Sequence, residues 1–292
     1  VFCKIEPNYC DKIRIYIARI PAFNAFMTAN GMMVIQTGAL IVLENEAQLA
    51  SLLGHEFGHY YHRHSIKRLQ KQEAINNAYS IFNNALFLGL AYMNANPYSY
   101  YNYDIANILS VGELGLMLAQ LSYFKYSREN ETEADMYGLD VLDRCGYQLN
   151  EAPKKWEKLI EMYDKTDVNI NFPSFTSSHP TPKKRINDLR KRIEENYLKK
   201  TGTLGQYEFN VVMSKLRKEW VKDEMSLGEF EKSKYVIENI SINKDRPGEK
   251  DFYMGEFYKL MYLKEKNKKK KSEYFDKAQR HLTISIEVDE KF

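Results

Sequence analysis

The sequence predicts an α+β fold that is mostly helical and holds one small β-sheet. Apolar residues recur at every third or fourth position between residues 49 and 60, and again between residues 134 and 142, which is the period of an amphipathic helix. Residues 12–19 and 32–36 instead alternate in polarity or run apolar, as β-strands do. We therefore expect two long helices, distant in the sequence, beside a short sheet.

The first predicted helix carries a His-Glu-x-x-His motif, from His55 to His59. Residues i and i+4 lie on one face of a helix, so both histidines can direct an imidazole nitrogen at one metal ion. Glu56 lies beside that face and suits the general base of a zinc-dependent peptidase. Gly54 and Gly58 each cost the helix roughly 1 kcal/mol relative to alanine, which indicates that another backbone approaches closely there.

A motif this short also occurs by chance, so it needs a third ligand as support. Zinc peptidases use three protein ligands and leave one position for water. Residues 126–142 are acidic at their start and then apolar with a helical period, which predicts a second helix. Glu129, Glu131 and Glu133 are the rival ligands on it. Because a helix presents only one stripe to a metal, the others are expected on a solvated face.

Several short segments, in order and spacing, resemble the forty-eighth metallopeptidase family. The matching segments are residues 24–26, 30–31, 37–38, 46–50, 55–59, 127–128 and 131–135. The resemblance spans roughly residues 13 to 192 and is strongest to the BepA-like branch. It implies a zincin fold of the gluzincin type, a metalloprotease domain that we place at residues 1–198.

The resemblance also implies the ligand set. In this family the glutamate that opens the Glu-x-x-Ala-Asp element is the third zinc ligand, which here is Glu131. One Zn²⁺ ion per chain would therefore be bound by His55, His59 and Glu131. Asp135, one turn after Glu131, would orient a ligand histidine by accepting its other N–H.

His179 stands directly before Pro180, in a segment that the prolines favour as ordered and extended. A similar His-Pro element follows the catalytic helices in the BepA-like branch. His179 would then either bind the zinc as a fourth ligand and hold the enzyme closed, or donate a hydrogen bond to the oxyanion during catalysis. Packing alone is a third interpretation. Arg185 would anchor the same loop.

Other residues near the motif have weaker interpretations. His62 could compete for the metal, but His62 and His64 fall near the end of the predicted helix, where the macrodipole favours a partly charged histidine. We expect both to be structural or exposed. Aromatic residues gather at 92–103, where they either cover the cleft or simply pack.

Residues 199–292 form a second predicted region, which opens with a linker at 199–205. Segments around residues 255–258 and 278–285 loosely resemble a tetratricopeptide helix pair, with the lysine run 268–271 as its turn. A plain helical hairpin is the alternative. If the resemblance holds, this TPR-like region is a docking surface for a protein partner.

Composition narrows the function further. The net charge of +3 gives no electrostatic case for nucleic acid. The most apolar stretch, residues 78–93, is short and interrupted by asparagines, so we expect no transmembrane segment, although the protein could associate with a membrane. The chain opens without a methionine or a signal sequence, so we expect a lost targeting segment and a periplasmic or otherwise exported protein. Cys3 and Cys10 could pair, or all three cysteines could be free thiols.

Together these features predict a zinc-dependent endopeptidase that hydrolyses unfolded or misassembled proteins in quality control. The substrate would bind as an extended strand along the edge of the sheet. The alternative is a latent protease with a closed zinc site, acting mainly as a chaperone-like interaction protein through its C-terminal helices.

Overall fold

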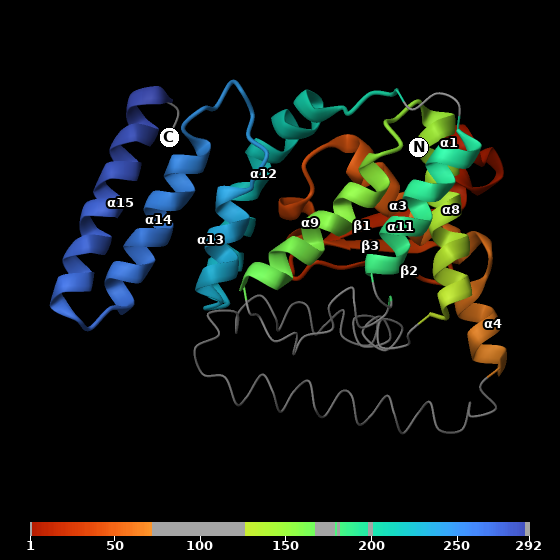
Figure 1. Ribbon diagram of the computed structural model, residues 1–292, viewed down its shortest axis with the longest axis horizontal. Helices are drawn as coiled ribbons and strands as arrows, with labels where there is room; N and C mark the ends of the chain where they lie inside the picture. The colour runs from red at the N-terminus through yellow and green to blue at the C-terminus, as the bar shows by residue number, and fades with distance from the viewer. Residues whose placement is uncertain (1, 72–125, 167–178, 180–181, 198–200, 290–292) are drawn as a thin grey trace.

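The computed structural model describes residues 2–71, 126–166, 179, 182–197 and 201–289 (Figure 1). The apolar stretch 78–93 and the aromatic-rich stretch 92–103 lie outside the described residues. Within the described part, no helix combines the length and the apolar character needed to cross a membrane.

The sheet has three strands, β1 (Arg14–Ala18), β2 (Ala25–Met27) and β3 (Met32–Gln36), in the order β1-β3-β2. β1 pairs parallel to β3, and β2 pairs antiparallel to it. The central strand is buried along its whole length, as its apolar run predicts. The sequence missed β2, because three residues are too few to display a period of two.

Helix α3 (Glu46–Tyr61) carries the His-Glu-x-x-His motif. It begins at Asn45, whose side chain accepts a hydrogen bond from the backbone N–H of Gln48. Leu52 and Phe57 are fully buried, so the predicted apolar stripe does face the interior. The helix packs against β2 on one side and against α8 on another.

Helix α8 (Arg128–Cys145) is the second predicted helix, capped at its start by the Ser127 side chain and closed by Gly146 in the left-handed conformation. It lies along α3 at very short range. A Cβ atom at Gly58 would stand 2.9 Å from the Cα of Ala134, and one at Gly54 would stand 3.1 Å from the Cα of Gly138. The absence of side chains at Gly54 and Gly58 therefore allows α8 to pack directly against the backbone of α3.

The remaining elements of the first region enclose these two helices. Helices α9 (Glu151–Thr166) and α11 (Pro182–Asn196) pack on one another and against α3 and α8 (Figure 1). The short elements are α1 (Phe2–Ile5), the 3₁₀ helix η1 (Pro7–Lys12), α2 (Thr37–Val42) and α4 (His64–Lys71). A disulfide joins Cys3 to Cys10, while Cys145 is free.

The C-terminal region consists of α12 (Gln206–Ser226), α13 (Phe230–Glu238), α14 (Glu249–Lys264) and α15 (Lys268–Val288). Helices α14 and α15 form an antiparallel hairpin at the far end of the molecule from α8 (Figure 1). We expected the lysine run 268–271 to form the turn between the two helices. It instead forms the first turn of α15. The side chain of Asn267 accepts hydrogen bonds from two of these lysine amides, and this cap starts the helix early.

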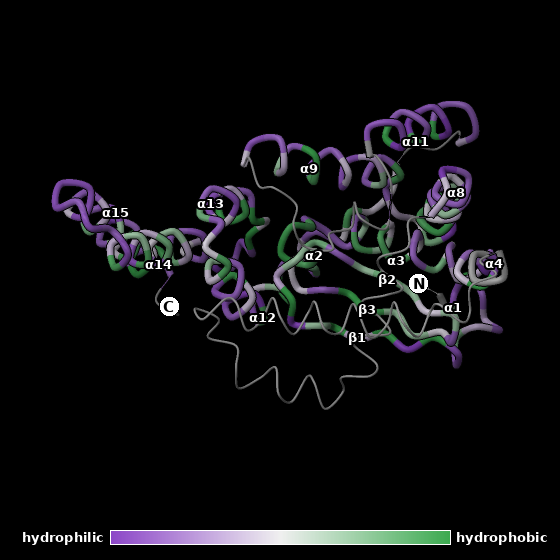
Figure 2. The backbone as a smooth tube through the Cα atoms, turned by 90° about the horizontal axis from the view of Figure 1, so that it is seen from below, coloured by the Kyte–Doolittle hydropathy of each residue, from purple (hydrophilic) through white to green (hydrophobic). Residues whose placement is uncertain are grey.

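Helix α12 ties the C-terminal region to the first one. It packs against α2 and α3, and its Asp223 accepts two hydrogen bonds from Arg19 beyond the end of β1, at 2.5 and 2.9 Å. Figure 2 shows hydrophobic residues gathered around α2 and β3, whereas the outer turns of α11 and α15 are hydrophilic. The boundary at residue 198 and the tetratricopeptide character remain predictions.

Replacing Gly58 with alanine tests the close approach of α3 to α8. Helix propensity alone would raise the free energy of unfolding by about 1 kcal/mol. The added methyl group would meet the backbone of α8, and overpacking of this kind costs about 1–3 kcal/mol. We expect the free energy of unfolding of Gly58→Ala, measured by urea denaturation, to be lower than that of the wild type. Thr283→Ala, on an exposed position of α15, should have a slightly higher free energy of unfolding than the wild type. A more stable Gly58→Ala variant would contradict the packing described here.

Candidate active site

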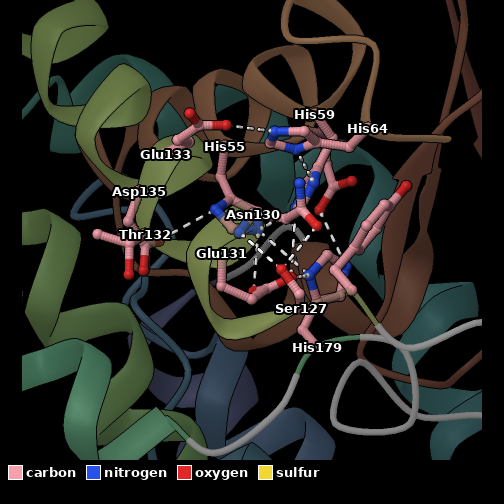
Figure 3. Close-up of polar contacts among 12 residues, drawn as sticks. His55, His59, His64, Ser127, Asn130, Glu131, Thr132, Glu133, Asp135 and His179 are labelled. Carbon is pink, nitrogen blue, oxygen red and sulfur yellow. Dashed lines mark hydrogen bonds and ion pairs between the residues drawn. The ribbon is translucent and has the colours of Figure 1, made fainter. Parts of the chain in front are cut away.

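Four side chains that can bind a metal converge in the interior (Figure 3). His55 and His59 come from α3, Glu131 from the first turn of α8, and His179 from the segment before α11. Their potential ligand atoms all lie within 4.8 Å of one another, and each side chain is at most 2% exposed. The donors therefore form one enclosed cluster.

The spacing of the donor atoms fits a zinc ion. A tetrahedral Zn²⁺ with bonds of about 2.0–2.1 Å places its ligand atoms about 3.3 Å apart. His55 Nε2 lies 3.1 Å from His59 Nε2 and 3.2 Å from His179 Nδ1, and His59 Nε2 lies 3.4 Å from Glu131 Oε1. One edge is shorter: His179 Nδ1 and Glu131 Oε1 lie 2.8 Å apart, at hydrogen-bond distance. Two imidazoles with a carboxylate, and a third imidazole beside them, suit zinc.

The protonation states also favour a cation. Burial lowers the pKa of His59 to about 4 and holds the pKa of His55 well below its ordinary value. Both rings are therefore neutral near pH 7, which is the form that binds metals. Burial alone would raise the pKa of Glu131, but His179 and Arg185 outweigh it and keep that pKa well below its usual range. Glu131 is a carboxylate.

Asp135 and Arg185 contact the residues of the donor cluster. Asp135 Oδ1 lies 3.0 Å from His55 Nδ1, which leaves the other ring nitrogen directed at the cluster. Arg185 donates to both oxygens of Asp135 at 2.7 Å, and its Nη1 lies 2.8 Å from Glu131 Oε2. Its guanidinium stacks over Trp156. We expected Arg185 to anchor the His179 loop, most of which lies outside the described part of the chain. The contacts of Arg185 in the described part include Asp135 and Glu131.

Glu56 is buried next to the donor cluster without being part of it. Its Oε1 atom accepts no hydrogen bond from a described residue and lies 3.7 Å from His179 Nε2. Burial, and then the neighbouring Glu131, raise the pKa of Glu56 well above its ordinary value. A carboxyl group of raised basicity at the edge of a metal cluster can take a proton from water.

The rival residues lie elsewhere. Glu129 is exposed, and Glu133 turns away from the donors toward His64. His62 makes ring contacts with Tyr61, His64 and Tyr137. We expected His64 to be structural or exposed. It is buried, and its Nδ1 lies 2.9 Å from His59 Nδ1.

Lys155 is a second buried group that sequence reasoning missed. Lys155 lies on α9, and its Nζ donates a hydrogen bond to Ser51 Oγ at 2.5 Å. Ser51 lies on α3, one turn before His55. Burial lowers the pKa of Lys155 to about 7. No sequence signal distinguishes it from the exposed lysines of the same helix.

Comparison with known proteins identifies the family. Residues 10–193, which include every residue of the cluster, match Peptidase family M48. The chain belongs to peptidase family M48. It is thus a metallopeptidase by family, and the predicted fold class, a mostly helical metallopeptidase fold with a small sheet, is confirmed.

Several curated M48 proteins resemble the chain. It is 30% identical over 212 residues to the beta-barrel assembly-enhancing protease of Escherichia coli (strain K12), which covers 68% of the chain and 41% of that protein. It is 28% identical over 191 residues to the mitochondrial metalloendopeptidase OMA1 of Schizosaccharomyces pombe, covering 65% of the chain and 49% of that protein. The chain therefore spans less than half the length of these two relatives.

Replacing Arg185 with methionine should destabilise the metal-free chain strongly. The substitution leaves Asp135 and Glu131 buried without their cation, and breaking a buried pair costs about 3–5 kcal/mol. Urea unfolding in the presence of a chelator measures the loss. Arg190→Met is the matched control on α11, because Arg190 makes an exposed pair with Glu157 that is worth about 1 kcal/mol or less. Equal losses in the two variants would contradict the role given to Arg185.

Proposed function

We propose that the chain is a zinc-dependent endopeptidase in which His55, His59 and Glu131 bind the metal and Glu56 is the general base. One observation carries the proposal: Glu56 is buried beside a buried cluster with zinc-like spacing, and its Oε1 atom has no hydrogen-bond partner among the described residues. When bound, zinc would supply a Lewis acid that polarises the scissile carbonyl and makes water more acidic.

The protein's own side chains would transfer the proton and bind the metal. Glu56 Oε1 takes the proton of the attacking water and passes it to the leaving amine. His55 and His59 hold the cation from α3, and Glu131 reduces its net charge from α8. No side chain needs to attack the substrate, so no acyl intermediate forms.

An extended peptide is the substrate that the sheet supports. β2 is an edge strand in the three-stranded sheet and packs beside α3. A substrate that adds to this edge would run along the helix that holds the histidines. We propose unfolded or misassembled proteins as substrates, because they expose such segments. The Cys3–Cys10 disulfide supports an exported, oxidising location, such as the periplasm.

His179 supports a closed resting state. Its Nδ1 atom lies within the donor cluster, where it would occupy the position that a catalytic zinc leaves for water. We therefore favour the latch over the oxyanion donor. In this state the chain would be a latent protease.

A latent protease would work mainly through its C-terminal helices. Leu263, Phe275, Ile286 and Val288 on α14 and α15 are 49–65% exposed, which supports a protein-binding role for residues 199–292. Rescue of a client protein from aggregation by a Glu56→Gln chain would support this second function, and loss of rescue would count against it.

Glu56→Gln should abolish cleavage of casein while leaving one zinc per chain, because the amide cannot accept the proton of water. Casein digestion and metal analysis of the purified chain provide the two measurements. Glu129→Gln, on the exposed face of α8, is the control and should cleave normally. A chelator should stop cleavage by both the wild type and the control. Turnover by Glu56→Gln would remove Glu56 from the mechanism.

His179→Ala should raise casein cleavage several-fold and weaken zinc binding, because it removes a fourth ligand from the resting site. Initial rates at saturating zinc measure the first effect. A fall in rate at unchanged zinc affinity would instead assign His179 to the oxyanion. Unchanged rate and affinity would exclude both roles.

A further inference from the structure

The Nδ1 atoms of the two histidines of α3 contact different kinds of partner (Figure 3). His55 Nδ1 contacts the carboxylate of Asp135 directly. His59 Nδ1 lies 2.9 Å from His64 Nδ1, and His64 Nε2 lies 2.7 Å from Glu133 Oε2. His59 thus reaches a carboxylate through a second imidazole.

Glu133 determines the direction of the hydrogen bonds that connect it through His64 to His59. The carboxylate of Glu133 can only accept, so His64 carries its proton on Nε2. A hydrogen bond between the two Nδ1 atoms needs one donor and one acceptor, and a His64 ring with its proton on Nε2 has a lone pair on Nδ1. That lone pair accepts the Nδ1–H of His59. The lone pair of His59 Nε2 is then left to face the other metal donors.

The fold holds His64 in this place. Helix α3 ends at Tyr61 and α4 begins at His64, and between them Arg63 has φ +55°, the one positive φ of a non-glycine residue in the described part of the chain. Such a conformation costs roughly 1–2 kcal/mol. The turn brings His64, 1% exposed, back against His59. The ring of Tyr126 stacks on His59 with centroids 3.8 Å apart.

His64 is not placed to bind the metal itself. It contacts the Nδ1 side of His59, whereas the cluster lies on the Nε2 side, and it is absent from the group of donors that share one centre. Both of its nitrogens already have partners. Its role is therefore exerted through His59.

We propose that His64 and Glu133 are positioning residues that fix the tautomer and the ring orientation of His59 for metal binding. The Glu133 side chain is 54% exposed, so the pair connects a buried ligand to the protein surface. This inference rests on the proposed zinc site. Removing the outer partner of a ligand histidine typically weakens metal affinity 10–100-fold.

Three variants separate the contributions. His64→Phe keeps a ring but removes the acceptor, Glu133→Leu removes the carboxylate, and Glu133→Gln retains an oxygen that can accept from His64. The control is His281→Phe, because His281 also hydrogen-bonds a carboxylate, that of Asp251 at 2.7 Å, but between α14 and α15. Zinc affinity is measured by competition with a chromophoric chelator, and the melting temperature of each metal-free chain is measured alongside.

We expect about a 10–100-fold weaker zinc affinity in His64→Phe, a smaller loss in Glu133→Leu, and near wild-type affinity in Glu133→Gln and His281→Phe. The metal-free Glu133 variants should melt like the wild type, since an exposed glutamate contributes little to folding. The visible spectrum of the cobalt-substituted chain should change in Glu133→Leu and be restored in Glu133→Gln.

Wild-type zinc affinity and an unchanged cobalt spectrum in His64→Phe would overturn the inference while leaving the zinc site intact. Equal effects of Glu133→Gln and Glu133→Leu would remove Glu133 from the pair. If His64→Phe does not fold, the two Glu133 variants decide alone. Failure of the wild-type chain to bind zinc would instead refute the proposed function.

Discussion

The contact between α3 and α8 is the constraint on which the site depends. Two of the proposed ligands come from one helix and a third from the other, so the distance between the helix axes sets the distance between donor atoms. Glycines at positions 54, 58 and 138 let the backbones approach almost to contact. A side chain at any of them would push Glu131 away from the histidines. The sequence gives up helix propensity here because metal geometry tolerates errors of only a few tenths of an ångström.

The second constraint is electrostatic. Glu56, Glu131 and Asp135 are all buried within one region, and burying three carboxyl groups is unfavourable unless cations accompany them. Arg185 contacts two of the three, and Lys155 lies nearby. These two side chains keep the cluster folded before a metal binds. The proposed metal ion would then enter a site whose remaining negative charge attracts it, so the same residues would determine folding, metal affinity and protonation.

The sequence was sufficient for the two long helices and for the group of donor residues that the structure brings together, whereas the ligand assignment stays a prediction. Residues i and i+4 must share a face, and the acidic start of α8 is recognisable from the family resemblance. It was insufficient where a long-range contact decides. Nothing local shows that Arg185 reaches across to Glu131, that Lys155 is enclosed, or that a two-residue turn returns His64 to His59. The three-residue strand β2 is created by pairing with β3, so no pattern of its own announces it.

The connection between α14 and α15 has a consequence for behaviour in solution. Residues 264–271 hold six lysines and one glutamate, a net charge of +5, whereas the whole chain carries +3, which leaves −2 for everything else. Four of these lysines lie in the first turn of α15, where the positive end of the helix dipole repels them. Added electrolyte screens that repulsion over about 10 Å at 0.1 M. The hairpin should therefore become more stable as ionic strength rises, whereas surface pairs of opposite charge become weaker.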